Sequence, residues 1–151
     1  MKRYVLSTVV LLLAGFAVSA AYAAKAMTPK PQLEKDATHI VVGKVRSISF
    51  TKHVGPEYVT TTYVAEIAVD RIEKGQGLKA GDVVRARYLT IGWRGIGTPV
   101  PHDSGHRPIP KKDDSVHVYL VNEGYNGAGY TKDGGYDVYY NNGFEILAPP
   151  R

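Results

Sequence analysis

Apolar and polar residues alternate with a period of two over several short stretches of this chain. Residues 58–72 give the clearest case, because Ala65, Ile67 and Val69 alternate with more polar neighbours. Successive side chains of a β-strand point to opposite faces, so this pattern predicts a strand with one buried face. The same reasoning predicts four further strands, at 39–50, 82–91, 115–121 and 136–147. No stretch has the apolar stripe of a long helix, and the pattern predicts an all-β domain.

Glycines and long loops refine this prediction. Gly43 inside the first strand predicts a bulge or a sharp bend, and Asn142-Gly143 predicts a hairpin turn within the last one. Residues 92–114 and 122–135 are rich in Gly, Pro or Asn and are predicted as two long loops, which in compact domains are often functional. Short strands with Gly-marked bends favour a small five-stranded OB-like barrel over residues 37–147.

The N-terminus has the three parts of a secretory signal peptide. A basic head of Lys2 and Arg3 precedes an uncharged apolar run, and small residues follow up to Ala23. The run is shorter than the roughly 20 residues that span a bilayer, although an uncleaved anchor is the alternative. We expect a signal peptide at 1–23, a flexible arm at 24–36 with one helical turn near Leu33, and a tail at 148–151.

This reading places the protein outside the cytoplasm, periplasmic or secreted, with no membrane span after signal removal. The chain has 19 basic and 14 acidic side chains with interspersed signs, which is not the clustered pattern of nucleic-acid binding. It has no cysteine, so disulfides, thiol nucleophiles and Cys-based metal sites are excluded. The hydrophobic core must therefore hold the fold without covalent help.

Four stretches of the chain resemble one known family. They read ATHIVVGKV at 37–45, YVAEIAVDRIEKG at 63–75, GLKAGDVV at 77–84 and NGFEIL at 142–147. They resemble bacterial exported domains with a TIMP-like (netrin-module-like) OB barrel, and the resemblance covers residues 37–147. It implies the barrel fold. Animal inhibitors of that fold chelate a protease's zinc through an N-terminal cysteine, which this chain lacks.

A possible metal site lies in the first long loop. His102 and His106 stand four residues apart around Asp103, as metal ligands do on a helix. The prolines on both sides argue against a helix, so any chelation would come from a loop. Zinc or copper would also need a third strong ligand, such as His53 or His117. A solvated loop without metal is the other reading.

Aromatic and basic residues suggest a binding surface. We predict Trp93, Arg94 and Tyr125 as contact residues, because aromatics and Arg supply most of the binding energy at interfaces. OB barrels commonly bind ligands on the face of strands 2 and 3. A ligand site at this position would be formed by five side chains, Lys52, His53, Arg85, Arg87 and Tyr125.

Two hypotheses for function follow. The chain lacks the G-x-S-x-G and S-x-x-K nucleophile motifs, a P-loop and a dinucleotide fingerprint. The first hypothesis is an exported, non-enzymatic binding module without cofactor, whose partner is an envelope or extracellular protein or polysaccharide. The alternative is a metal-binding protein or metal-dependent hydrolase that uses His102, Asp103 and His106.

The signal peptide gives the first testable prediction. N-terminal sequencing of protein recovered from the periplasm or the medium should begin near Ala24, because cleavage is expected after the small-x-small pair Ala21 and Ala23. An intact Met1 in a cytoplasmic fraction would contradict export.

Overall fold

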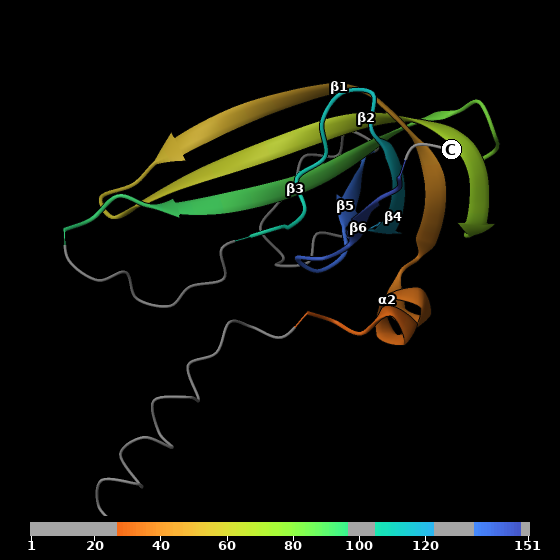
Figure 1. The fold of residues 1–151 in the computed structure, drawn as a ribbon, viewed down its shortest axis with the longest axis horizontal. Helices are drawn as coiled ribbons and strands as arrows, with labels where there is room; N and C mark the ends of the chain where they lie inside the picture. Colours follow the sequence, from red (N-terminus) through yellow and green to blue (C-terminus); the bar gives the residue numbers. More distant parts are fainter. Residues whose placement is uncertain (1–26, 97–104, 123–134, 149–151) are drawn as a thin grey trace, which may run out of the picture. The chain divides into compact units, whose positions relative to one another are not determined.

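The computed structural model describes residues 27–96, 105–122 and 135–148. Within these residues the chain forms one short helix and six strands (Figure 1). In chain order they are α2 (Lys30–Asp36), β1 (His39–Val54), β2 (Tyr58–Lys74), β3 (Val83–Trp93), β4 (Ser115–Val121), β5 (Tyr136–Val138) and β6 (Phe144–Ile146). The predicted all-β class is confirmed.

Five of the strands close into a ring. The order is β1-β2-β3-β5-β4, and β4 pairs back onto β1. All of these pairings are antiparallel except β3 with β5, which is parallel. The predicted fifth strand is split into β5 and β6, which both run antiparallel to β4. The predicted hairpin at Asn142-Gly143 is therefore wrong: the chain makes a turn, with Tyr140 at φ 53°, and continues in the same direction.

The core lies inside the ring and follows the predicted alternation. Ala65, Ile67 and Val69 of β2 are at most 2% exposed and pack with the inward residues of the other strands. These include Val84, Ala86, Tyr88, Val116, Val118, Leu120 and Phe144. The register of β1 on β2 shifts between Val42 and Gly43, which confirms the predicted irregularity. A Cβ on Gly43 would overlap the Ala68 carbonyl, so the close approach of the strands requires glycine there.

Helix α2 covers a second, smaller apolar cluster. Leu33 is 2% exposed and belongs to one cluster with Ile40 and Tyr119. Lys74 Nζ donates to the carbonyl oxygens of Glu34 and Lys35, both at 2.8 Å, near the helix C-terminus. The helix lies within the segment 24–36 for which the sequence predicts a flexible arm. Its one buried leucine explains why this part of the segment is docked instead.

Strands β1, β2 and β3 are longer than the ring that they help to form. β4 pairs with β1 only along 39–44, and β5 pairs with β3 only at 86–87. Residues 47–54, 58–66 and 85–93, which include the two β3 residues that pair with β5, form a three-stranded extension that we call the ribbon (Figure 1). In β1, Arg46 has no partner on β2, so a bulge marks the point where the ribbon leaves the ring.

The parallel pairing that closes the ring is short and carries a buried ion pair. β3 and β5 share two residue pairs, Ala86 with Tyr136 and Arg87 with Asp137. Arg87 Nε donates to Asp137 Oδ1 at 2.9 Å, and the two side chains are only 9% and 6% exposed. Arg87 also donates to the Gly135 carbonyl at 3.3 Å.

This geometry predicts a large and specific cost for removing the carboxylate. Asp137→Asn leaves the Arg87 charge buried without its counter-ion, so the free energy of unfolding should fall by about 3–5 kcal/mol. The measurement is the urea midpoint at unchanged slope. The control is Glu66→Gln in the exposed pair with Arg85, whose N···O distance is 3.7 Å; its cost should stay below about 1 kcal/mol. Equal costs would contradict the assigned role of the closing pair.

Candidate functional site

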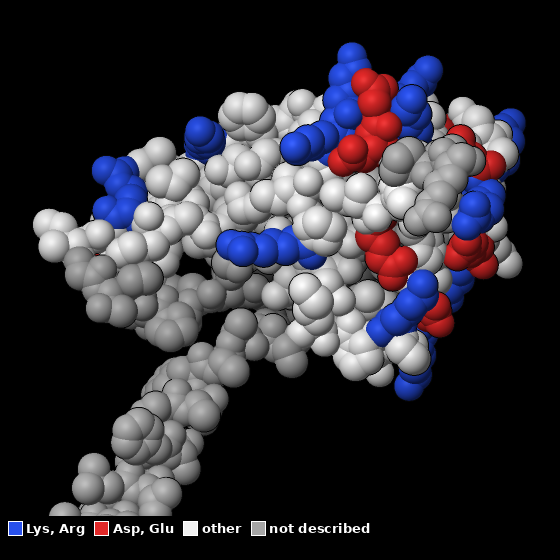
Figure 2. All heavy atoms as spheres, in the orientation of Figure 1, with Lys and Arg blue, Asp and Glu red and all other residues white. Residues whose placement is uncertain are grey.

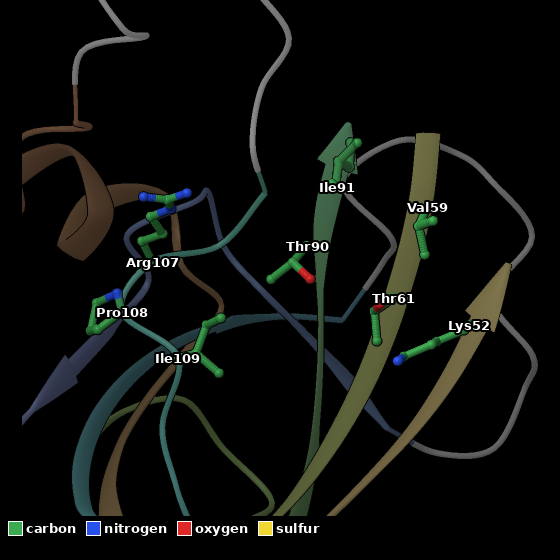
Figure 3. A pocket seen from close by; sticks show the side chains of 9 residues that line it. Lys52, Val59, Thr61, Thr90, Ile91, Arg107, Pro108 and Ile109 are labelled. Atoms are coloured by element: carbon green, nitrogen blue, oxygen red, sulfur yellow. The ribbon is translucent and has the colours of Figure 1, made fainter. Parts of the chain in front are cut away.

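A pocket of about 500 Å³ lies on the inner face of the ribbon, the face that continues into the core (Figure 3). The ribbon forms one wall, and the chain segment that follows Gly105 forms the other. The lining residues are Lys52, Val59, Thr61, Thr90, Ile91, Gly92, Arg107, Pro108 and Ile109.

Strand register builds the ribbon wall. Lys52 pairs with Thr61, and Thr61 pairs with Thr90, so one residue from each strand forms a row across the sheet. The next row toward the core holds Tyr63 and Tyr88 on the same face. The pocket therefore begins where the apolar core ends, and its nearest row presents an ammonium group and two hydroxyls. Thr61 is only 7% exposed.

Gly105 and His106 hold the second wall against β3. Gly105 has φ 81° and forms a β-bridge with Thr90, where a Cβ would overlap the Leu89 carbonyl. The Leu89 N–H donates to His106 Nδ1 at 3.2 Å. The same nitrogen lies 3.1 Å from the Leu89 carbonyl oxygen, and Nε2 lies 3.1 Å from the Val138 carbonyl oxygen. His106 thus joins β3 to β5 and positions Arg107 and the residues after it.

The pocket has a positive electrostatic character. Lys52 and Arg107 are both exposed and stand on opposite walls (Figure 3), and no carboxylate is among the described lining residues. On the face drawn in Figure 2, the charged side chains over the ribbon are mainly Lys and Arg, whereas both signs mix over the ring. A lining with two cations and two threonine hydroxyls suits an anionic group.

An aromatic row adjoins the pocket. The Phe50 and Tyr63 ring centroids are 6.0 Å apart, and Tyr63 stacks on Tyr88 at 5.0 Å. Phe50 is 59% exposed, and Lys52 Nζ lies 5.7 Å from its ring centroid. Burial raises the pKa of the Tyr88 hydroxyl, so this group stays protonated at neutral pH. The exposed part of the row offers an apolar shelf beside the cationic pocket.

Two predicted contact residues stand at the end of β3. Trp93 is the last residue of the strand and packs edge-on against Tyr58, with ring centroids 4.9 Å apart. Its ring also covers Gly95. Arg94 has an exposed side chain, and its backbone N–H donates to the Glu57 carbonyl at 2.8 Å. Both residues follow directly on Gly92 of the pocket wall. Tyr125 lies outside the described residues.

The cationic cluster predicted for the face of strands 2 and 3 is not assembled. Lys52 is in the pocket row, but Arg85 pairs with Glu66, five residues along β2 from Thr61. That spacing corresponds to about 17 Å of strand. Arg87 is buried in the closing ion pair, and His53 alternates with Lys52 and points to the other face. Sequence reasoning named Lys52 but missed Arg107, Thr61 and Thr90.

The metal hypothesis can be examined only at His106, because His102 and Asp103 lie outside the described residues. Both ring nitrogens of His106 lie within hydrogen-bond distance of backbone groups of Leu89 and Val138. Over residues 27–96, 105–122 and 135–148, no group of three or more His, Cys, Asp or Glu is placed to hold a metal ion.

A second polar cluster surrounds His117 on the outer face of β4. Its Nδ1 lies 3.0 Å from Glu145 Oε2, and its Nε2 lies 2.9 Å from Glu73 Oε2. A hydrogen bond from Arg71, assisted by His117, holds the pKa of Glu73 below its usual range. Burial raises the pKa of Glu145, but His117 and Lys30 outweigh that effect and the net pKa is lowered. The cluster ties α2, β2, β4 and β6 together.

Comparison with known proteins adds no assignment: no protein-family model, curated protein or solved structure matches the chain. The TIMP-like resemblance therefore stays a prediction. Among the described residues, no helix is long and apolar enough to cross a membrane.

The bridging role of His106 can be tested by its removal. His106→Ala leaves the Leu89 N–H and the Val138 carbonyl without their partner, so the free energy of unfolding should fall by about 1–3 kcal/mol. His53→Ala, at an exposed position on β1, should change it by less than about 0.5 kcal/mol. Chemical denaturation measures both. A His106 variant as stable as the His53 variant would rule out the bridge.

Proposed function

We propose that this protein is an exported binding module without enzymatic activity, and that its ligand presents an anionic group to the pocket of the ribbon. The observation that supports this proposal is the set of side chains that line the pocket. Lys52 and Arg107 belong to opposite walls, Thr61 and Thr90 also line the pocket, and the described lining residues include no carboxylate.

The arrangement of strands supports this proposal. The ring order β1-β2-β3-β5-β4-β1, with β3 parallel to β5, agrees with the OB-like barrel expected from the sequence. Ligands of OB folds typically occupy the face of strands 2 and 3, between flanking loops. The pocket is built on β2 and β3 and is flanked by the segment after Gly105. The proposed site therefore lies where this architecture most often binds.

The side chains that line the pocket limit the class of ligand that it can bind. A guanidinium group binds carboxylate, sulfate or phosphate oxygens through two parallel hydrogen bonds, and Lys52 adds a second positive charge. The exposed face of Phe50 and the half-buried Tyr63 suit a sugar ring or an apolar side chain. An acidic polysaccharide, or a protein segment with acidic groups, from the envelope or the extracellular space fits both features.

Two parts of the proposal rest on the sequence: that the protein is not an enzyme, and that it is exported. The chain has no cysteine and none of the common nucleophile or nucleotide motifs, and its N-terminus has the three parts of a signal peptide. No cofactor is needed for the proposed binding. The protein would act in the periplasm or after secretion.

The single tryptophan offers a direct assay, because Trp93 follows the pocket residue Gly92. Titration with oligogalacturonate, sulfate, phosphate or an acidic hexapeptide should change the Trp93 fluorescence saturably for at least one anion. A neutral oligoglucose should have no effect. The double variant Lys52→Ala, Arg107→Ala should weaken binding at least about ten-fold, equivalent to 1.4 kcal/mol.

The matched control is Lys79→Ala with Lys112→Ala, which removes two exposed cations away from the pocket and should retain wild-type affinity. Equal loss in both double variants would indicate general charge attraction and contradict a specific site. Stoichiometric zinc or copper in the purified protein, lost on His102→Ala with His106→Ala, would favour the metal alternative.

A further inference from the structure

Among the described residues, the ribbon has a backbone edge along β1 that no other strand pairs with. At Val45 this edge is still occupied, because its N–H donates to the Asp114 carbonyl and its C=O accepts from the Asp113 N–H, both at 2.9 Å. Beyond Val45, no segment among the described residues pairs with that side of β1 (Figure 1). The strand runs on to Val54, so a long edge is available for further pairing.

The register identifies which backbone groups face this edge. Gly55 N–H donates to the Tyr58 carbonyl at 2.8 Å. This bond shows that the odd-numbered residues at this end of β1 direct their backbone groups toward β2. In an antiparallel pair, alternate residues bond to the partner strand and the others point away. The residues that point away are Ile48, Phe50, Lys52 and Val54. Their side chains share the inner face of the ribbon, as the position of Lys52 in the pocket requires.

We propose that a second copy of this chain pairs antiparallel with this edge, with Thr51 on the two-fold axis. This register sets Phe50 opposite Lys52 of the second copy, and Ile48 opposite Val54 of the second copy. By symmetry each contact occurs twice, and all four edge-facing residues of each copy are hydrogen-bonded. A register centred on Phe50 would set Val54 against Arg46, which lies in the bulge, and would leave edge groups unpaired.

The pairing of Lys52 with Phe50 favours a second copy in this register. Residues 45–54 contain Arg46, Lys52 and His53 and no acidic residue, so a register that opposes like cations would be repulsive. A lysine on an edge strand usually discourages pairing. Here Lys52 faces an aromatic ring instead, and the same two residue types already lie together within one chain, with Nζ 5.7 Å from the Phe50 ring.

Two large exposed apolar side chains support an interface at this edge. Phe50 is 59% and Val54 is 57% exposed, and both belong to the edge-facing set. The proposed pairing places each of them beside a side chain of the second copy. The inner faces of the two ribbons would then lie on the same side of one continuous sheet. The inference does not depend on the identity of any ligand, or on the pocket being a binding site.

A single engineered cysteine tests the register, because the chain has no cysteine of its own. In the proposed dimer the two Thr51 residues form a non-hydrogen-bonded pair, with Cα atoms about 4.5 Å apart, within disulfide range. The purified Thr51→Cys variant should therefore form a covalent dimer under a glutathione redox buffer. The control is Ser49→Cys, exposed on the same face, whose two copies would be about 13 Å apart and should remain largely monomeric.

A backbone test separates pairing from simple apolar contact. Phe50→Pro removes an edge-facing N–H without removing a bond to β2, whereas Phe50→Ala removes only the ring. Sedimentation over about two decades of concentration should show a reversible wild-type dimer, and Phe50→Pro should weaken it at least ten-fold more than Phe50→Ala. Circular dichroism should confirm that both variants remain folded.

Two results would overturn the proposal. One is a wild-type protein that stays monomeric throughout, with Thr51→Cys no faster to cross-link than Ser49→Cys. The other is a dimer that survives Phe50→Pro unchanged. Binding of an extended acidic peptide to the monomer, sensitive to Phe50→Pro, would instead assign the edge to a different protein.

Discussion

The buried ion pair between Arg87 and Asp137 is the contact on which the closed sheet depends. Strand β5 meets β3 at two residue pairs and β4 at two residue pairs, whereas the other seams of the ring have longer runs of antiparallel pairs. If that contact opens, the inward residues of β3 and β4 lose their common wall. The cost of desolvating both charges is offset only by good geometry, which the 2.9 Å separation provides.

Ring closure also determines where the candidate site can lie. Because the ring uses only part of β1 and β3, the same strands pass from an apolar interior to a solvent-facing ribbon. Tyr63 and Tyr88 mark the boundary between these two environments. The inward face changes there from valine and alanine to threonine and lysine, without any change of strand. The ribbon wall of the pocket is therefore formed by the same sheet face that lines the core.

The alternation of apolar and polar residues predicts the strands well. It does not predict which distant residues contact each other. The alternation of Ala65, Ile67 and Val69 predicts a buried face from neighbouring residues alone, and the structure confirms it. Arg87 has the same outward position in its pattern as Arg85, so the sequence predicts a surface residue. Its burial comes from Asp137, fifty positions later, and no periodicity reports such a distant contact.

The same limit applies to the pocket. Lys52 is predicted from the face on which OB barrels bind ligands, but Arg107 belongs to a segment whose prolines and glycines predict only a loop. Its position depends on Gly105 and His106 binding to β3, which requires the tertiary fold. The outer cluster around His117 was missed for the same reason, since its carboxylates come from β2 and β6.

The position of the closing strand has a consequence for the order of events in folding. Residues 136–138 follow the other four strands of the ring in the sequence, and they join β3 to β4. A chain that emerges N-terminus first from a ribosome can pair β1 with β2 and β3 early, but its ring can close only after β5 has emerged. Until β5 is in place, β3 and β4 lack the strand that joins them, so the core inside the ring stays open to solvent.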